Sequence, residues 1–168
     1  ALAVRQRARR AAIGHLHRVR LHTRLPIVLP ERIDSAFVEL WSAVRLQKVV
    51  VVHANHANEI GDGVRAALTR LAATGSTLLN QSVLLRGVND SIAALEELSV
   101  ALFESDVLPY YLHLLDPVRG AAHFDVPADS ARRLLAQLTA RLPGYLVPKL
   151  VREDPGAASK TMLPPASR

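Results

Sequence analysis

The chain has 168 residues, of which 49% are hydrophobic and 21% charged, a composition typical of a globular protein. A chain of this length buries roughly 70% of its unfolded surface, so one ordinary domain with a hydrophobic core is expected. No apolar run is long enough to span a membrane, and the arginine-rich start, residues 1–10, lacks the apolar stretch of a secretory signal. We therefore expect a soluble, cytoplasmic protein that does not associate with membranes.

Cysteine is absent, which excludes a disulfide framework and any thiolate metal site within the sequence, and we assign no metal ligand to it. The net charge of +6 comes almost entirely from arginine, because only Lys48, Lys149 and Lys160 are lysines. A basic chain can bind nucleic acid through its phosphates. The arginine bias alone does not indicate such a partner, and we expect none.

Short β-rich runs alternate with longer amphipathic segments, which is the signature of βα units and a parallel sheet. Five mostly continuous apolar runs predict buried parallel strands, at residues 19–22, 49–53, 77–84, 108–115 and 145–150. Apolar residues spaced three and four apart predict covering helices, at residues 31–46, 64–73, 92–104 and 128–140. The stretch 152–168 has no such periodicity and is expected to be a loosely attached loop.

Three helix ends carry recognisable signals. Pro30 precedes the first predicted helix at a favourable position, and Gly75 can form a left-handed cap after the second. The third follows three residues that can each accept the free amides of a first turn, namely Asn89, Asp90 and Ser91. These patterns predict an α/β fold, and they leave open whether the sheet is doubly wound or part of a closed barrel.

Polar residues gather where the predicted strands end, which is where ligands bind in both architectures. The second strand runs into residues 53–59, with the sequence His-Ala-Asn-His-Ala-Asn-Glu, the third into Asn80-Gln81-Ser82, and the fourth into Asp116. Near the chain end, Lys160 follows a loop of small residues, 156–159, that lets backbone approach a ligand closely. Lysine can attach covalently to a carbonyl group when desolvated, whereas a tail lysine is more often solvated, and the residues alone leave both readings open.

Several motifs in order and spacing resemble the lysine 2,3-aminomutase family. They are residues 53–59, residues 80–90, the sequence Tyr-Tyr-Leu-His at 110–113 and the sequence Gly-Tyr-Leu-Val-Pro at 144–148. The branch that makes β-lysine for elongation factor P is similar in three further features: Asp116, residues 120–124 and the sequence Ser-Lys-Thr at 159–161. The resemblance covers nearly the whole chain, from about residue 18 to residue 160.

The resemblance implies a fold and a division of the chain. Residues 1–150 would form the C-terminal half of a (βα) TIM-type barrel of the radical S-adenosylmethionine enzymes, with about five parallel strands and covering helices. Residues 151–168 would form a loop and tail that carry the lysine for pyridoxal 5′-phosphate.

The resemblance also implies an isomerase that converts (S)-α-lysine to (R)-β-lysine, using pyridoxal phosphate, S-adenosylmethionine and a 4Fe-4S cluster. Lys160 would attach to the pyridoxal group, while Asp116 and Glu153 would bind the side-chain ammonium of the substrate L-lysine. Residues near the two cofactors would include His53, Asn55, Gln81 and His113. The product would serve elongation factor P and its lysyl-transferring ligase, and the intact enzyme would be a monomer or dimer.

The family's cluster needs three cysteines in the order Cys-x-x-x-Cys-x-x-Cys, and none is present. We therefore interpret the sequence as truncated upstream, and we predict that this chain alone is inactive. A second hypothesis from another class is a non-catalytic half-barrel that binds or assembles with another chain. Other amino-acid 2,3-aminomutase activities are less favoured, since the carboxylates of Asp116 and Glu153 would repel an acidic substrate side chain.

Overall fold

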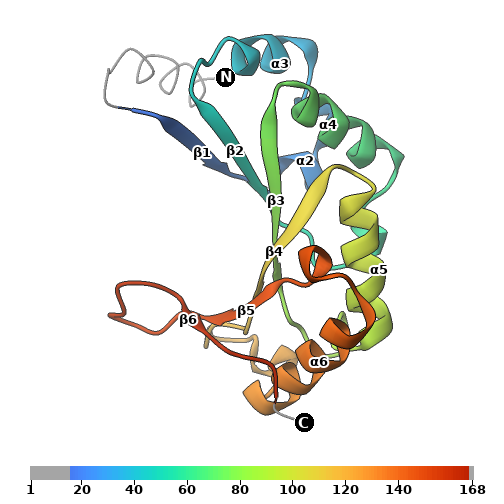
Figure 1. Ribbon diagram of the computed structural model, residues 1–168, viewed down its shortest axis with the longest axis vertical. Coiled ribbons are helices and arrows are strands. Elements are labelled where there is room, and N and C mark those ends of the chain that lie inside the picture. Colours follow the sequence, from blue (N-terminus) through green and yellow to red (C-terminus); the bar gives the residue numbers. More distant parts are fainter. Residues whose placement is uncertain (1–15, 167–168) are drawn as a thin grey trace.

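The computed structural model describes residues 16–166 and contains one curled sheet (Figure 1). Its strands lie side by side in chain order, and the first five are parallel while the sixth is antiparallel to the fifth. The strands are β1 (Arg18–His22), β2 (Gln47–Val52), β3 (Ser76–Val83), β4 (Val107–His113), β5 (Lys149–Arg152) and β6 (Thr161–Met162). The predicted α/β class with five parallel strands is confirmed, and the curl is that of a partial TIM-type barrel.

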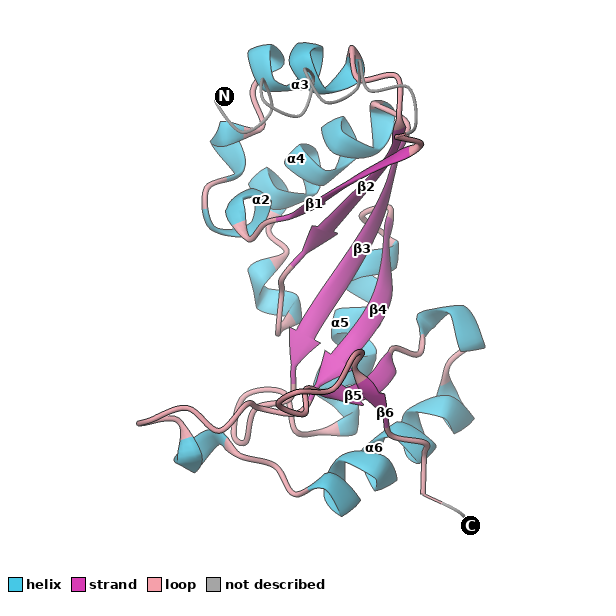
Figure 2. Ribbon diagram, turned by 90° about the vertical axis from the view of Figure 1, so that its left-hand side faces the viewer, coloured by secondary structure: helices cyan, strands magenta, loops and turns pink. Residues whose placement is uncertain are grey.

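Helices cover one face of this sheet and leave the concave face without a helix in the part of the chain described (Figures 1 and 2). They are α2 (Leu25–Val28), α3 (Ser35–Ser42), α4 (Asp62–Ala73), α5 (Ile92–Phe103) and α6 (Ala128–Arg141). Four short 3-10 turns join the elements, η1 (Pro30–Arg32), η2 (Ala57–Glu59), η3 (Ala122–Phe124) and η4 (Gly144–Leu146). No helix in the range 16–166 is long and apolar enough to cross a bilayer.

The helix starts follow local capping chemistry. The Ser91 hydroxyl accepts the amide of Ala94 at 3.2 Å, and Gly75 adopts φ 75°, so both predicted caps are confirmed. The single helix predicted over residues 31–46 is wrong in extent, because Asp34 accepts the amide of Phe37 at 2.7 Å and starts α3 only at residue 35. Pro30 begins a separate 3-10 turn instead.

Two hydrophobic clusters lie between the sheet and its helices. The first packs the fully buried Trp41 of α3 against Val50 and Val52 of β2 and the buried face of α4. The second packs Leu112 of β4 and Leu150 of β5 against α6. Because side chains alternate along a strand, the residues between these positions face the concave side of the sheet.

The C-terminal part differs from the prediction. The strand expected over residues 145–150 is shifted to 149–152, because residues after Pro143 form the turn η4. The tail is not a loosely attached loop, since β6 pairs with β5 and the Leu163 amide donates to the Leu150 carbonyl at 2.9 Å. Strand β5 continues across the expected boundary at residue 150, whereas the part of the expected first unit in residues 1–15 lies outside the described residues.

Candidate functional site

A hollow of about 290 Å³ opens at the carboxyl ends of β2, β3, β4 and β5. Residues from all four strand ends line it: His53, Gln81, Ser82, Val83, His113, Leu114, Leu115, Asp116, Val118 and Glu153. Five residues predicted for the site thus meet at one place, and they come from segments up to 100 residues apart in the sequence. The parallel order of the sheet explains this, because the carboxyl ends of parallel strands share one edge.

Glu153 and Lys160 face each other across the loop between β5 and β6. In this antiparallel pair Val151 lies opposite Met162 and Arg152 opposite Thr161, so residues 153 and 160 form the next opposite position. The Lys160 ammonium donates a hydrogen bond to Glu153 Oε1, and this bond lowers the pKa of the Glu153 carboxyl below its ordinary value. The pairing places the predicted cofactor lysine beside a predicted substrate carboxylate.

The same loop is held closed from its other side. Asp154 accepts hydrogen bonds from Thr161 Oγ1 at 2.6 Å and from Arg152 Nε at 2.7 Å. These two bonds lower the pKa of the Asp154 carboxyl. The loop ends are therefore fixed independently of the Glu153–Lys160 contact.

His113, at the end of β4, lies within electrostatic reach of both predicted acidic residues. Its Nδ1 is 3.8 Å from Glu153 Oε1, and its imidazole is largely buried with a side-chain exposure of 14%. Burial is the main cause of its lowered pKa, followed by the Lys160 ammonium, while Glu153 and Asp116 act in the opposite direction. His113 is therefore a neutral imidazole near pH 7, within the reach of two carboxylates and one ammonium.

A β-bulge brings two aromatic rings onto this face. Asn80 pairs with Pro109 and Gln81 with Tyr111, so Tyr110 is an extra residue in β4. The hydroxyls of Tyr110 and Tyr111 share a hydrogen bond of 3.0 Å, and this bond is the main cause of the raised pKa of Tyr111. The Lys160 ammonium lies 5.8 Å from the centroid of the Tyr111 ring, within cation–π range.

Two more histidines border the site from β1 and β2. The rings of His22 and His53 are 6.2 Å apart. Burial is the largest cause of the lowered pKa of both, with Arg20 the next cause for His22 and Arg24 for His53. The Lys160 ammonium is a smaller cause of the lowered pKa of His22.

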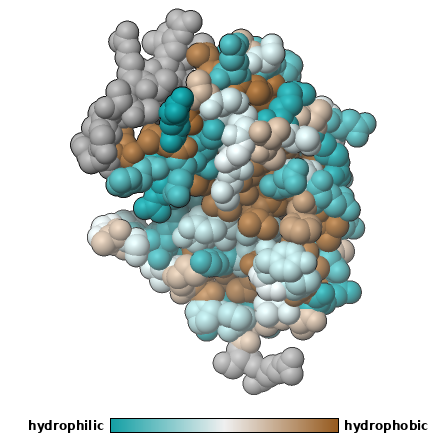
Figure 3. Space-filling view, turned by 45° about the horizontal axis from the view of Figure 1, so that its top comes forward, coloured by the Kyte–Doolittle hydropathy of each residue, from teal (hydrophilic) through white to brown (hydrophobic). Residues whose placement is uncertain are grey.

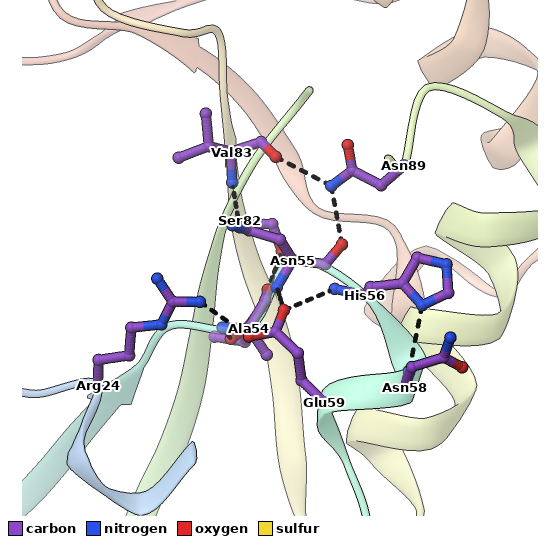
Figure 4. Close-up of polar contacts among 10 residues, drawn as sticks. Arg24, Ala54, Asn55, His56, Asn58, Glu59, Ser82, Val83 and Asn89 are labelled. Atoms are coloured by element: carbon purple, nitrogen blue, oxygen red, sulfur yellow. Dashed lines mark hydrogen bonds and ion pairs between the residues drawn. The ribbon is translucent and has the colours of Figure 1, made fainter. Parts of the chain in front are cut away.

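The polar turn after β2 is occupied mainly with backbone hydrogen bonds (Figure 4). Glu59 Oε1 accepts the amides of Asn55 and His56 at 2.6 and 3.0 Å, and its other oxygen accepts from Arg24. Asn55 Oδ1 accepts the Val83 amide at 2.8 Å. Asn55 does not line the hollow, in contrast to His53 of the same turn.

Three buried residues complete this network beneath the turn. Asn80 pairs with both the amide and the carbonyl of Ala54, at 2.8 and 3.0 Å, and donates to Ser82 at 2.8 Å. Asn89, which is fully buried, donates to the carbonyls of Asn55 and Val83 at 2.8 and 2.9 Å. The network therefore fixes the backbone that delivers His53 and Gln81 to the hollow.

Asp116 follows β4 and lies at the border of two cavities. It lines the hollow described above and a neighbouring one of about 500 Å³, which is formed with residues 117–119, 121, 122 and 125 of the next loop. Its residue is exposed to solvent, so its carboxylate is accessible to a cation from either side. Asp116 and Glu153 both act to raise the pKa of His113, so each carboxylate lies within electrostatic reach of this imidazole.

The sequence reasoning did not identify His22 and Tyr111 as site residues. A signal for His22 exists in β1, where Arg18, Arg20 and His22 alternate with Val19 and Leu21, and only the latter two pack on the helix-side core. Tyr111 had no comparable signal, because its direction depends on the bulge at Tyr110.

The side chains present fit one of the implied cofactors and not another. Lys160 is a primary amine with 29% side-chain exposure beside an aromatic ring, which fits attachment of a pyridoxal group. The sequence holds no cysteine, and the described residues contain no cluster of three or more metal-ligating side chains. The residues present therefore do not fit an iron–sulfur cluster.

Comparison with known proteins gives strong matches. The chain is 54% identical to L-lysine 2,3-aminomutase of Escherichia coli over 152 residues, which cover 90% of the chain and 44% of that protein. It is 51% identical to the enzyme of the same name from Haemophilus influenzae over 89% of the chain, and 38% identical to that of Clostridium subterminale over 91%. No family model matches the chain.

The matches cover only part of each relative. The chain spans less than half the length of each, 44% of the first two and 36% of the third. Over about 90% of its length, this chain is homologous to the L-lysine 2,3-aminomutases, and the resemblance drawn from its motifs is confirmed.

Proposed function

We propose that this chain is the substrate-binding and pyridoxal-binding part of a lysine 2,3-aminomutase, an isomerase that converts (S)-α-lysine to (R)-β-lysine. The meeting of Lys160, Glu153 and His113 at the carboxyl ends of the strands is the observation that carries the proposal. The name of the relatives at 47–54% identity supports the reaction class.

Lys160 is proposed to attach pyridoxal 5′-phosphate. Its amine reaches the concave face beside the Tyr111 ring, and the small-residue loop before it offers little steric obstruction. When bound, the pyridoxal group would supply delocalisation of an unpaired electron during the 1,2-amino shift. Gln81, His53 and His113 line the hollow next to this amine and are proposed to position the cofactors, whereas Asn55 would act through the backbone of Val83.

Asp116 and Glu153 are proposed to bind the side-chain ammonium of L-lysine. A cation removed from water needs paired carboxylates, and both carboxylates lie within electrostatic reach of His113. A site built this way discriminates against substrates that lack the ammonium group. An acidic side chain would meet two negative charges and is disfavoured.

The radical step is outside what this chain can support. A 4Fe-4S cluster and S-adenosylmethionine are proposed for the full-length protein, but this sequence has no thiolate to hold the cluster. We therefore propose that the chain alone is inactive and that cysteine ligands lie elsewhere in a longer protein. The similarity of Asp116, residues 120–124 and Ser159-Lys160-Thr161 to the elongation factor P branch supports β-lysylation of that factor, with its ligase as the functional partner.

Reductive labelling tests the assignment of Lys160. The 168-residue chain is incubated with pyridoxal 5′-phosphate, reduced with borohydride, digested and mapped, with Lys48 and Lys149 as internal comparisons. We expect the label on Lys160 and its loss in Lys160→Ala. Label on Lys48 or Lys149, or spread evenly over the three lysines, would contradict the proposal.

The second candidate is a non-catalytic half-barrel that assembles with another chain. It is favoured by β1, which is at one end of the sheet and pairs only with β2 among the described residues. An unpaired strand edge promotes association. Exposed hydrophobic side chains such as Phe103 and Tyr145, whose rings are 5.3 Å apart, add apolar surface, and Figure 3 shows hydrophobic side chains among hydrophilic ones on one face of the molecule.

The coding sequence upstream of Ala1 separates the two candidates. An in-frame Cys-x-x-x-Cys-x-x-Cys motif would establish the cluster site and favour the enzyme. A start codon at the boundary would favour the assembly module. A sedimentation measurement of the purified chain would then report whether it associates with itself.

A further inference from the structure

We propose that a second cavity, between the turn after β3 and helix α6, binds a small organic molecule that carries a phosphate group. The cavity has a volume of about 430 Å³, within the range of sites for small ligands. It shares no lining residue with the hollow at the carboxyl ends of the strands. The inference is therefore independent of the proposed function and of the residues assigned to it.

Two arginines from separate elements supply the positive charge of this cavity. Arg86 belongs to the turn after β3 and Arg133 to α6, and both residues are exposed. Within residues 16–166, neither guanidinium takes part in an ion pair. A guanidinium presents several N–H donors in one plane, so two of them can bind the oxygens of one phosphate group.

Local contacts bring both cations to the start of α6. The Arg86 amide donates to the Phe124 carbonyl at 2.8 Å, so the turn after β3 lies against the segment that leads into this helix. Arg133 Nη2 donates to Ser130 Oγ at 3.0 Å, which directs the guanidinium towards the same end of the helix. Because the Ser130 oxygen accepts this bond, its own hydroxyl proton is available to a ligand.

The turn that carries Arg86 is fixed by hydrogen bonds of its own. The buried Asn89 accepts the Leu85 amide at 2.7 Å, and Asp90 accepts the Gly87 amide at 2.8 Å. Gly87 adopts φ 72°, a conformation that suits glycine. The backbone of this wall is thus formed before a ligand arrives, which reduces the entropy lost on binding.

The other wall suits an organic ligand better than a bare inorganic ion. Val126 and Leu134 give it an apolar surface, and Leu134 also packs against the second hydrophobic cluster. Gln137 adds an amide group. It lies on the same side of α6 as Leu134 and Ser130, because residues three, four and seven apart share one face of a helix. A phosphate ester with an apolar body matches this combination of surfaces.

Asp90 is the carboxylate of the cavity, and it allows a test in which binding becomes stronger. Its negative charge opposes a bound phosphate, while its Oδ1 holds the Gly87 amide. Asparagine keeps an oxygen for that amide and removes the charge. Asp90→Asn should therefore strengthen phosphate binding, which damage to the turn would not do.

The test is a titration of the isotope-labelled 168-residue chain with phenyl phosphate, followed by NMR at pH 7.5 and low ionic strength. The phosphate group then carries about two negative charges, and salt does not screen it. We expect shifts at the amides of residues 86–90 and 126–137, with saturation at millimolar concentration. Phenol, which lacks the phosphate, should cause none of them. Inorganic phosphate should bind less tightly, because it cannot contact Val126 and Leu134.

Four variants test the residues of the cavity. We expect Arg86→Gln and Arg133→Gln each to weaken binding of phenyl phosphate about five- to tenfold, and Asp90→Asn to strengthen it about two- to fivefold. Arg45→Gln is the matched control, because Arg45 is exposed and precedes β2 at the opposite, amino end of the sheet. It removes the same charge from the chain and should leave the affinity unchanged.

Several results would overturn the inference. Equal weakening by all three arginine variants would mean that phosphate responds to net charge alone, and shifts confined to the hollow would place it elsewhere. Weaker binding by Asp90→Asn would mean that the titration reports a loosened turn. Equal affinity for inorganic phosphate and phenyl phosphate would reject an organic ligand, and no saturation at millimolar concentration would reject the site.

Discussion

Two polar regions lie at the same edge of the sheet and use their side chains in opposite ways. The turn after β2, residues 53–59, contains many polar groups, and most of those with assigned contacts bind backbone atoms. The β5–β6 loop, residues 153–160, contains fewer, and the side chains of Glu153 and Lys160 contact each other and the side chains of His113 and Tyr111. A high density of polar residues therefore marks a structural turn here, whereas accessible, opposite charges mark the position that we propose to be reactive.

Asn80→Ala should have the largest effect on stability. Asn80 is 1% exposed and makes three hydrogen bonds, so its removal leaves the buried amide of Ala54 without its partner and the Ala54 carbonyl with the Ser82 hydroxyl alone. We expect a loss of about 2–4 kcal/mol in the free energy of unfolding. Urea titration followed by the fluorescence of the single Trp41 measures it.

Asn58→Ala is the matched control for that change. Asn58 lies in the same turn but is exposed, so we expect the free energy of unfolding of this variant to stay within about 0.5 kcal/mol of that of the parent chain. Similar losses for both variants would show that the buried network is not what stabilises the turn.

The same substitution made in both regions sharpens the comparison. Glu59→Gln weakens the bonds to Asn55, His56 and Arg24, and Glu59 is only 25% exposed, so we expect a loss of about 1–2 kcal/mol. Glu153→Gln removes one exposed ion pair and should cost less than about 1 kcal/mol.

Urea midpoints for the two glutamine variants measure this difference. If Glu153→Gln were the more destabilising of the two, the β5–β6 loop would depend on its ion pair for stability. The assignment of Glu153 to function rather than to the fold would then have to be withdrawn.

The comparison also explains what sequence could predict. The apolar runs predicted the five parallel strands, the fifth of them shifted from residues 145–150 to 149–152, because the side chains that pack against the helices are apolar in every strand. Strand β6 was missed, since two residues, Thr161 and Met162, carry no periodicity and gain their structure from pairing with β5. Helix α3 began later than expected because the Asp34 cap, a single side-chain bond, decided the boundary.

The sequence predicted only part of the candidate site. The polar strand ends predicted the edge of the sheet at which the hollow opens, and Gln81, His113 and Asp116 line this hollow. The residues of 53–59 looked equally reactive in sequence, because a carboxylate that caps a turn cannot be told from a free one without its partners. Lys160 was selected by the family resemblance, since the physical signals around it also suit a solvated tail.

The smallest expected effect is a pH dependence of stability, which comes from three histidines that border the hollow. Burial is the first cause of the lowered pKa of His22, His53 and His113, so each binds a proton less readily in the folded state than in the unfolded chain. The direction in which stability changes with pH follows from the difference in bound protons between the folded and the unfolded chain. Above the unfolded pKa of about 6.5 these histidines are neutral in both states and their contribution to stability is complete.

As the pH falls below about 6.5, the unfolded chain gains protons that the folded chain does not, and stability declines. The lowered pKa of Glu153 acts in the same direction but only at more acidic pH, since a paired carboxylate is lost when it is protonated. We expect the urea midpoint to fall between pH 7.5 and pH 5.5, and His113→Gln to reduce that fall. A midpoint that rises on acidification would mean that the histidines gain carboxylate partners in the folded state, with His113 held charged by Glu153 and Asp116.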